Sequence, residues 1–174
     1  MGGVNRPAAS SASALARMRQ QRRRDTKPEM ALRRAVHALG FRYRVDVTVL
    51  PDIRRRADLV FPTEQVAVFV DGCFWHGCPT HSTAPRANAA WWADKLAANR
   101  ARDLDTNRRL GAAGWHVERV WEHEDPCDGA QRVAAAVRRR RAGRPPERNI
   151  TAHPTPRTAD SGPQGDPQSD LAVR

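Results

Sequence analysis

The densest group of reactive side chains in the sequence lies between Phe69 and His81. This stretch, FVDGCFWHGCPTH, holds two cysteines, two histidines and an aspartate within thirteen residues. Thiolates and imidazoles are the ligands that Zn²⁺ prefers, and a closed structural site takes four of them. Cys73, Cys78 and His81 are close enough in sequence to reach one ion, so a fourth ligand must come from elsewhere.

The fourth ligand has two candidates in the segment after the last predicted strand. His123 lies two residues past Trp121, and Cys127 follows it. We favour His123, because neighbouring strands would bring it beside the end of the strand that precedes Asp71. The alternative is two free buried cysteines and a surface His81, and the spacing, which is not that of a C-x2-C finger, leaves both open. A loop-rich segment with little apolar content needs some other stabilising link, which favours bound zinc.

Asp58 is a candidate ligand for a second kind of metal. It belongs to the segment ADLVF, which we expect to be a central strand. A buried carboxylate is costly unless it is paired or bound to a metal, and hard cations such as Mg²⁺ prefer oxygen. Asp58 can equally lie at an exposed strand end and pair with Arg54, Arg55 or Arg56.

His76 lies inside the predicted zinc loop but out of step with the proposed ligands. It can act as a general base near neutral pH, serve as a spare ligand or lie on the surface. A base needs an orienting partner, and Asp103 is a candidate that spacing alone does not bring to His76. Glu29 fits a capping box with Thr26 and can also face an active site.

Four aromatic residues, Phe74, Trp75, Trp91 and Trp92, lie within nineteen residues of this basic chain. Aromatic side chains on exposed loops can wedge between base steps of DNA. Core packing is the simpler interpretation for any single ring. Four rings around polar loops are hard to accommodate in so small a core.

The pattern of apolar residues predicts an α/β fold that positions these side chains. In chain order we expect a helix from Thr26 to Gly40, strands at 41–49, 57–61 and 66–70, a helix at 91–114, a strand at 115–121, a loop at 122–129 and a helix at 130–141. The first strand alternates, so its odd-numbered residues, Phe41 to Val49, are expected on one face. The order favours a mixed sheet flanked by helices.

Composition indicates a polyanionic partner. The chain has 174 residues, with 30 Lys and Arg against 19 Asp and Glu, and a formal net charge of +11. Nucleic acid is the commonest partner of so basic a protein. We expect a flexible basic arm at 1–24, a folded domain at 25–141 and a disordered tail at 142–174. No run approaches the ~20 apolar residues of a membrane span, and no signal peptide is evident, so we expect no membrane partner and a cytoplasmic protein.

Several motifs together resemble one enzyme family. RRRDTKPE, ADLVFP, VFVDGCFWHGCPTH, the W-x2-K-x3-N-x2-RD pattern from Trp92 to Asp103, and GWHVERVWEHE are similar to those of the very-short-patch-repair (Vsr) mismatch endonucleases. The resemblance runs from about Ser13 to about Arg141. It implies a restriction-endonuclease-like fold and an enzyme that nicks DNA 5′ of the thymine in T·G mismatches, which arise when 5-methylcytosine deaminates.

The resemblance also implies roles for individual residues. Asp58 corresponds to the central Mg²⁺ ligand, with the backbone carbonyl of Val70 as another ligand. His76 corresponds to the catalytic histidine, Asp103 to its supporting acid and Glu29 to the acidic residue of the first helix. The rings that insert beside the mismatch correspond to Phe74, Trp75 and Trp92, and the structural zinc ligands to Cys73, Cys78, His81 and His123.

The sequence departs from the usual restriction-nuclease pattern. Ala57 precedes Asp58, and no lysine follows in VAVFVDG. Asp71 lies roughly where that lysine would be and has no assigned role, so water activation is left to His76. The tail at 142–174 has no counterpart in the resemblance.

Two other functions are compatible with these motifs. One is a zinc-stabilised DNA-binding module without catalysis, and the other is a restriction-like nuclease that cuts paired or differently damaged DNA. For the favoured reading, the partner is double-stranded DNA with a T·G mismatch, together with other repair proteins, at the nucleoid. One active site that makes one nick needs only a monomer.

Overall fold

The structure is a computed structural model that describes residues 24–143, apart from 82, 84 and 85. All of these residues belong to one compact unit. The predicted arm at 1–24 and the predicted tail at 142–174 lie almost wholly outside the described residues and stay predictions. None of the described helices combines the length and the apolar content of a membrane span.

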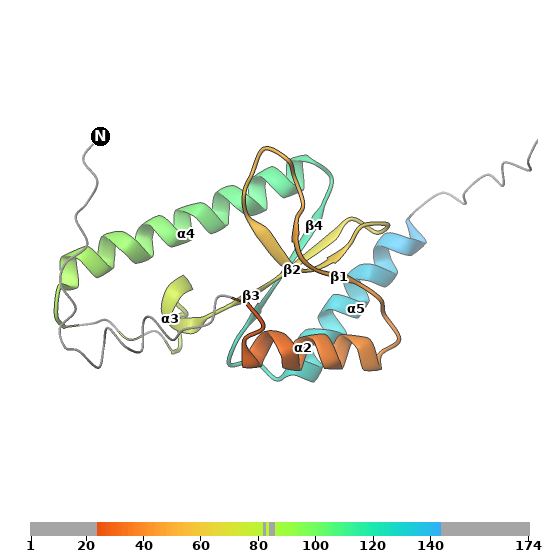
Figure 1. Ribbon diagram of the computed structural model, residues 1–174, viewed down its shortest axis with the longest axis horizontal. Coiled ribbons are helices and arrows are strands. Elements are labelled where there is room, and N and C mark those ends of the chain that lie inside the picture. The colour runs from red at the N-terminus through yellow and green to blue at the C-terminus, as the bar shows by residue number, and fades with distance from the viewer. Residues whose placement is uncertain (1–23, 82, 84–85, 144–174) are drawn as a thin grey trace, which may run out of the picture. The chain divides into compact units, whose positions relative to one another are not determined.

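The described chain forms a mixed sheet with helices on both faces (Figure 1). In chain order the elements are α2 (Lys27–Ala38), β1 (Arg44–Thr48), β2 (Arg56–Phe61), β3 (Val66–Asp71), α3 (Cys73–His76), α4 (Ala89–Ala112), β4 (His116–Trp121) and α5 (Pro126–Ala142). The strand order is β1-β2-β3-β4, antiparallel except for the parallel pair β3 and β4. The predicted mixed α/β class is confirmed, while its relation to restriction endonucleases stays a prediction.

Each face of the sheet buries its own apolar cluster. Along β3, Val66 and Val68 join the cluster beneath α2 and α5, and Ala67 joins the cluster beneath α4. This alternation follows from the period of two along a strand. A central strand covered on both faces therefore has the continuous apolar sequence VAVFV, as predicted.

Helix α2 begins at the predicted capping box. The Thr26 hydroxyl lies 3.5 Å from the backbone N–H of Glu29, and it donates to the Glu29 carboxylate at 2.9 Å. The other Glu29 oxygen accepts from the backbone N–H of Asp25 at 2.9 Å. This network fixes the first turn of α2, and with it the position of Glu29.

The predicted single face of the first strand is wrong. Phe41 and Tyr43 pack with the cluster beneath α2 and α5, whereas Val47 and Val49 pack with the cluster beneath α4. Asp46 lies between them with a φ of +52°. A left-handed residue interrupts the alternation of a strand, so the side chains on either side of Asp46 point to opposite faces.

The predicted loop at 122–129 is too long, because α5 already begins at Pro126. The Asp125 carboxylate caps the helix by accepting from the backbone N–H of Cys127 at 2.7 Å, and proline suits the first turn. Gly129 then lets α5 approach β4 closely, since a Cβ there would lie 2.8 Å from Val120 Cγ1. The one-turn helix α3 was also not predicted.

The carboxyl end of α5 is tied to the turn between β2 and β3. Arg140 Nε donates to the backbone carbonyl of Glu64 at 2.9 Å, and Arg141 Nε donates to the Glu64 carboxylate at 2.6 Å. Arg140 also donates to the carbonyl of Gly114. These two arginines of the terminal basic run therefore bind the protein itself.

Candidate active site

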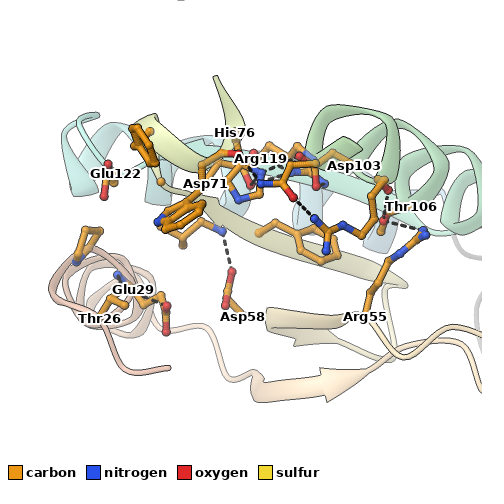
Figure 2. A pocket seen from close by; sticks show the side chains of 18 of the residues that line it. Thr26, Glu29, Arg55, Asp58, Asp71, His76, Asp103, Thr106, Arg119 and Glu122 are labelled. Atoms are coloured by element: carbon orange, nitrogen blue, oxygen red, sulfur yellow. Dashed lines mark hydrogen bonds and ion pairs between the residues drawn. The ribbon is translucent and has the colours of Figure 1, made fainter. Parts of the chain in front are cut away.

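A cleft of about 950 Å³ opens where β3 and β4 end and β2 begins (Figure 2). Helix α2 borders it with Thr26 and Glu29, and α4 borders it with a row of polar residues. All of the predicted catalytic residues line this one cleft, namely Glu29, Asp58, Val70, His76 and Asp103.

Asp58 lines the cleft, and its carboxylate is bonded to the backbone of β3. Its Oδ2 accepts a hydrogen bond from the backbone N–H of Val70 at 2.7 Å. The alternative of a pair with the neighbouring arginines is not supported, because Arg55 pairs with Asp105 and Arg56 pairs with Asp46, each at 2.6 Å. Among the described residues no salt bridge reaches Asp58.

The environment of Asp58 disfavours its charged form. Burial raises the pKa of the Asp58 carboxyl to about 6, against the opposing hydrogen bond from Val70. The carboxylates of Glu29 and Asp71 raise this pKa further, and Arg33 lowers it. A carboxylate held close to other carboxylates in a cleft has the electrostatics of a cation site.

Glu29 is buried, and its charge is balanced within α2. Arg33 donates to Glu29 Oε2 at 3.2 Å and also pairs with Asp25. Glu29 thus combines the capping role with a place in the cleft wall, as the sequence allowed. Arg33 itself was not singled out from the sequence, and its helical spacing of four from Glu29 was the available signal.

His76 and Asp103 are brought together by α3 and α4. His76 Nδ1 lies 2.6 Å from Asp103 Oδ2, although the two residues are 27 positions apart in the chain. Burial lowers the pKa of His76, but the hydrogen bond to Asp103 and the charges of Asp71 and Asp103 outweigh this effect and raise it overall. Burial opposes the ionised form of Asp103, yet the bond from His76 and the charge of Arg119 hold its pKa below the usual value. The ionised Asp103 carboxylate therefore accepts a hydrogen bond from His76 Nδ1–H, and the proton stays on the imidazole.

Asp71 and Arg119 complete the polar wall of the cleft. Arg119 Nη1 lies 2.7 Å from both oxygens of the buried Asp71 carboxylate. Arg119 Nη2 lies 3.3 Å from Asp103 Oδ1. Sequence reasoning left Asp71 without a role and did not single out Arg119.

The four aromatic residues gather on the rim of the cleft instead of in either core cluster. Phe74 makes edge-to-face contacts with Trp75 and Trp92, each with ring centroids 5.1 Å apart. Trp91 lies against Trp92 at 4.9 Å. The buried Asn99 of α4 donates to the Trp75 carbonyl at 2.9 Å and so ties α3 to α4. The simpler interpretation as core residues is therefore wrong for this group, since all four rings line the cleft.

The four predicted zinc ligands form one group beside the cleft. The candidate ligand atoms of Cys73, Cys78, His81 and His123 all lie within 4.8 Å of one another. Cys73 Sγ is 3.0 Å from His123 Nδ1, and Cys78 Sγ is 3.8 Å from His81 Nδ1. This set of two thiols and two imidazoles fits a metal such as Zn²⁺. Cys127 is exposed at the start of α5 and does not belong to the group.

The two thiols of this group have different acidities. Burial and the neighbouring Cys78 raise the pKa of Cys73 to about 11. Burial would also raise the pKa of Cys78, but hydrogen bonds from Thr80 and His81 lower it to about 6. Of the two thiols, Cys78 therefore has the lower pKa.

Comparison with known proteins identifies the family. Residues 9–82 match the family model described as DNA mismatch endonuclease Vsr. The type II nicking enzyme V.NaeI of Lentzea aerocolonigenes is 47% identical over 133 residues, which cover 75% of this chain and 78% of that protein. This chain belongs to the Vsr family. It is accordingly a DNA endonuclease.

Other relatives of this Vsr-family endonuclease support the same assignment. The type II nicking enzyme V.XorIIP of Xanthomonas oryzae pv. oryzae is 40% identical over 108 residues, covering 62% of this chain and 77% of that protein. The DNA mismatch endonuclease Vsr of Escherichia coli K12 is 33% identical over 106 residues, covering 60% of this chain and 66% of that protein. The resemblance deduced from the motifs is confirmed.

The segment that matches the family model holds only part of the candidate site. The matched segment 9–82 contains Glu29, Asp58 and His76. Asp103 and His123 come from later elements, and the fold brings them to His76 and to the two cysteines. The site is therefore assembled from both halves of the domain.

Proposed function

We propose that this Vsr-family endonuclease nicks double-stranded DNA on the 5′ side of the thymine in a T·G mismatch, as the first step of very short patch repair. The observation that carries the proposal is the 2.6 Å contact between His76 and Asp103 in the cleft that Asp58 also lines. A polarised imidazole and a carboxylate that forms no salt bridge among the described residues can supply the base and a metal ligand for metal-assisted phosphodiester hydrolysis.

His76 is the proposed general base. Because Asp103 engages Nδ1, the neutral imidazole carries its proton there and leaves Nε2 free to accept a proton from water. The side chain of His76 is 27% exposed, so water can reach it. Asp103 keeps the imidazole in this tautomer and stabilises the imidazolium that forms when the water is deprotonated.

Asp58 is the proposed ligand of Mg²⁺, together with the backbone carbonyl of Val70. The fit rests on the raised pKa of a carboxyl that has two other acidic groups nearby and no salt bridge among the described residues. When bound, Mg²⁺ supplies positive charge that stabilises the phosphate and the leaving oxygen. Glu29 adds negative charge to the same end of the cleft.

The aromatic rim is the proposed mismatch sensor. Phe74, Trp75 and Trp92 stand together beside the candidate catalytic groups and belong to neither core cluster. Inserting rings into a duplex requires that base steps unstack, and a mismatched step unstacks at a lower cost than a paired one. Lys95 and Arg102 lie exposed along the cleft and are suited to contact phosphates.

The proposed zinc site supports this loop and takes no part in the chemistry. The loop that carries His76, Phe74 and Trp75 starts at Cys73 and ends near Cys78 and His81, and His123 joins it to the end of β4. Zinc bound to all four would fix the loop against the sheet. One described chain supplies every residue of the proposed site, so we propose the monomer as the active form.

The relatives favour a second candidate substrate class. Two of those compared are named type II nicking enzymes and one is named a mismatch endonuclease. A nicking enzyme whose substrate is not a mismatch is therefore the alternative. It would use the same proposed base and metal ligand, but it would not need the rings to enter the duplex.

The deciding experiment compares nicking of T·G, U·G and fully paired duplexes in Mg²⁺, each across several flanking sequences. The proposal expects a single nick 5′ of the thymine and a strong preference for T·G over the paired duplex. Equal nicking of paired duplexes would support the alternative substrate class. Binding of DNA without nicking in any divalent metal would instead leave a DNA-binding module.

A further inference from the structure

We propose that Arg119 is a positioning residue that makes Asp103, and not Asp71, the hydrogen-bond partner of His76. It does so by binding the carboxylate oxygens of Asp71, which would otherwise compete for the imidazole. This inference rests on the proposed role of His76 as the base. It gives a function to Asp71 and Arg119, two residues of the cleft wall that the proposed mechanism does not use.

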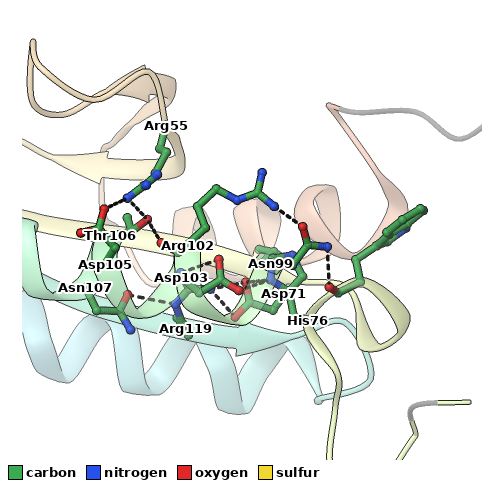
Figure 3. Close-up of polar contacts among 12 residues, drawn as sticks. Arg55, Asp71, His76, Asn99, Arg102, Asp103, Asp105, Thr106, Asn107 and Arg119 are labelled. Atoms are coloured by element: carbon green, nitrogen blue, oxygen red, sulfur yellow. Dashed lines mark hydrogen bonds and ion pairs between the residues drawn. The ribbon is translucent and has the colours of Figure 1, made fainter. Parts of the chain in front are cut away.

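The guanidinium of Arg119 is fixed by contacts with residues of β3 and α4 (Figure 3). Nη1 contacts both oxygens of Asp71 at 2.7 Å, and Nη2 lies 3.3 Å from Asp103 Oδ1. Nε donates to Asn107 Oδ1 at 3.1 Å, and the guanidinium lies 5.0 Å from the centre of the Phe69 ring. A planar group with fixed donors can bridge two carboxylates in this way, whereas a lysine ammonium is a single flexible point charge.

The arrangement resolves a competition between two carboxylates for one imidazole nitrogen. Asp71 Oδ1 lies 3.6 Å from His76 Nδ1, and Asp103 Oδ2 lies 2.6 Å from the same atom. Arg119 engages both oxygens of Asp71 but only Oδ1 of Asp103. Asp103 Oδ2 is the oxygen left for His76, so Arg119 determines which carboxylate the imidazole binds.

Burial makes this allocation necessary. The side chain of Asp71 is only 5% exposed, so a carboxylate there needs a cation or several donors. Among the described residues, the carboxylates that pair with His76 are those of Asp71 from β3 and Asp103 from α4, and Arg119 is the cation that contacts both. Without Arg119, Asp71 would be free to bind the imidazole, and the ring would lose the single orientation that the bond to Asp103 gives it.

A role in stability alone is the competing explanation, since the same contacts join β3, β4 and α4. The two explanations differ in what happens when His76 is absent. A residue that acts through His76 has no further effect on the nicking rate in a His76→Ala background, whereas a residue that only stabilises the fold lowers the activity in both backgrounds.

The test measures single-turnover nicking of a T·G duplex at saturating enzyme, with DNA affinity measured separately by fluorescence anisotropy. Arg119→Lys and Arg119→Gln should each lower the rate roughly tenfold or more while the dissociation constant changes less than about threefold. In the His76→Ala background, Arg119→Gln should change the residual rate by less than about twofold. The matched control is Arg141→Gln, which removes an arginine that pairs with Glu64 at the far end of α5, away from the cleft, and should leave the rate unchanged.

The outcomes separate this inference from the proposed function. A wild-type rate in Arg119→Lys overturns the positioning role, because the charge is kept and only the fixed geometry is lost. An equal loss from Arg119→Gln with and without His76 also overturns it. Should His76→Ala itself nick at the wild-type rate, the proposed base is wrong, and should the wild-type enzyme ignore the mismatch, the proposed substrate is wrong.

Discussion

The carboxylate of Asp58 accepts a hydrogen bond from the backbone N–H of Val70 at 2.7 Å, just past the last backbone pair between β2 and β3. The Asp58 side chain thus makes a hydrogen bond to β3 at the point where backbone pairing between β2 and β3 stops. Its remaining oxygen has no hydrogen-bond donor among the described residues, while its pKa is raised to about 6, chiefly by burial. A group in this position is costly to the fold when it is ionised.

Replacing Asp58 by asparagine should therefore stabilise the metal-free protein and abolish nicking. The pKa rises from 3.8 to about 6 on folding, so the cost is absent below pH 4, grows between these two values and is complete above pH 6. A shift of about two units corresponds to a gain of up to roughly 3 kcal/mol for Asp58→Asn at pH 8. Urea unfolding of both proteins at pH 8 and pH 4 measures the difference.

The control for this prediction is Asp94→Asn, which changes an exposed aspartate on α4. It should alter the free energy of unfolding by less than about 0.5 kcal/mol at either pH. If Asp58→Asn were less stable than wild type at pH 8, the interpretation of Asp58 as a strained metal ligand would be wrong. Binding to T·G duplex should be nearly intact in Asp58→Asn, because the wedge residues are unchanged.

His76→Ala should lower the single-turnover nicking rate by ~10²-fold or more, since general base catalysis contributes at least that much. DNA affinity should hardly change, because His76 is proposed to act on water. The control is His37→Ala, which removes an exposed histidine at the far end of α2. A rate within twofold of wild type for His76→Ala would contradict the proposed mechanism.

Purified protein should contain one zinc ion per chain by elemental analysis, because four ligand atoms of the right kind lie together. Cys78→Ser should lose this zinc and destabilise the domain by about 2 kcal/mol or more. Cys127→Ser is the matched control and should retain the metal, since Cys127 is exposed and outside the group. Protein without zinc but with full activity would return both buried cysteines to the category of free thiols.

Two glycines in helices should respond to alanine in opposite ways. At Gly129 a Cβ would lie 2.8 Å from Val120 Cγ1 and 3.3 Å from Leu32 Cδ1, so Gly129→Ala should destabilise the domain by about 1–3 kcal/mol. At Gly111 a Cβ would meet nothing within 4 Å, and Gly111→Ala should stabilise α4 by up to about 1 kcal/mol. Thermal unfolding of both variants checks the packing of α5 on β4; a stabilising Gly129→Ala would refute it.

Local sequence signals predicted the parts of the site that local contacts build. The cap at Thr26 and the Cys73, Cys78 and His81 group each lie within a few residues, and the structure has both. The fourth member, His123, was predictable because β3 and β4 were expected to be neighbours. Residue spacing did not indicate the contact of His76 with Asp103, which depends on how α4 packs across the sheet.

The contact between Asp71 and Arg119 could not be predicted from the sequence, for a geometric reason. In the parallel register, Arg119 lies opposite Phe69 and Asp71 lies opposite Trp121. The guanidinium reaches the carboxylate only in this register, and only because residues 69, 71 and 119 point to the same face of the sheet. The prediction for the strand around Asp46 failed for a local reason. The alternation of apolar residues was recognised from the sequence, but the left-handed backbone of Asp46, which the sequence did not indicate, turns the residues before and after it to opposite faces of the sheet.

The last turn of α5 determines where the chain can be truncated without loss of contacts. A truncation after Val137 would keep every buried apolar residue of the helix, yet it would remove Arg140, which binds the carbonyls of Glu64 and Gly114, and Arg141, which binds the Glu64 carboxylate. The hairpin turn would then face water without its cover. A truncation that keeps these contacts therefore has to retain Arg140 and Arg141, and hydrophobic content alone is a poor guide for choosing it.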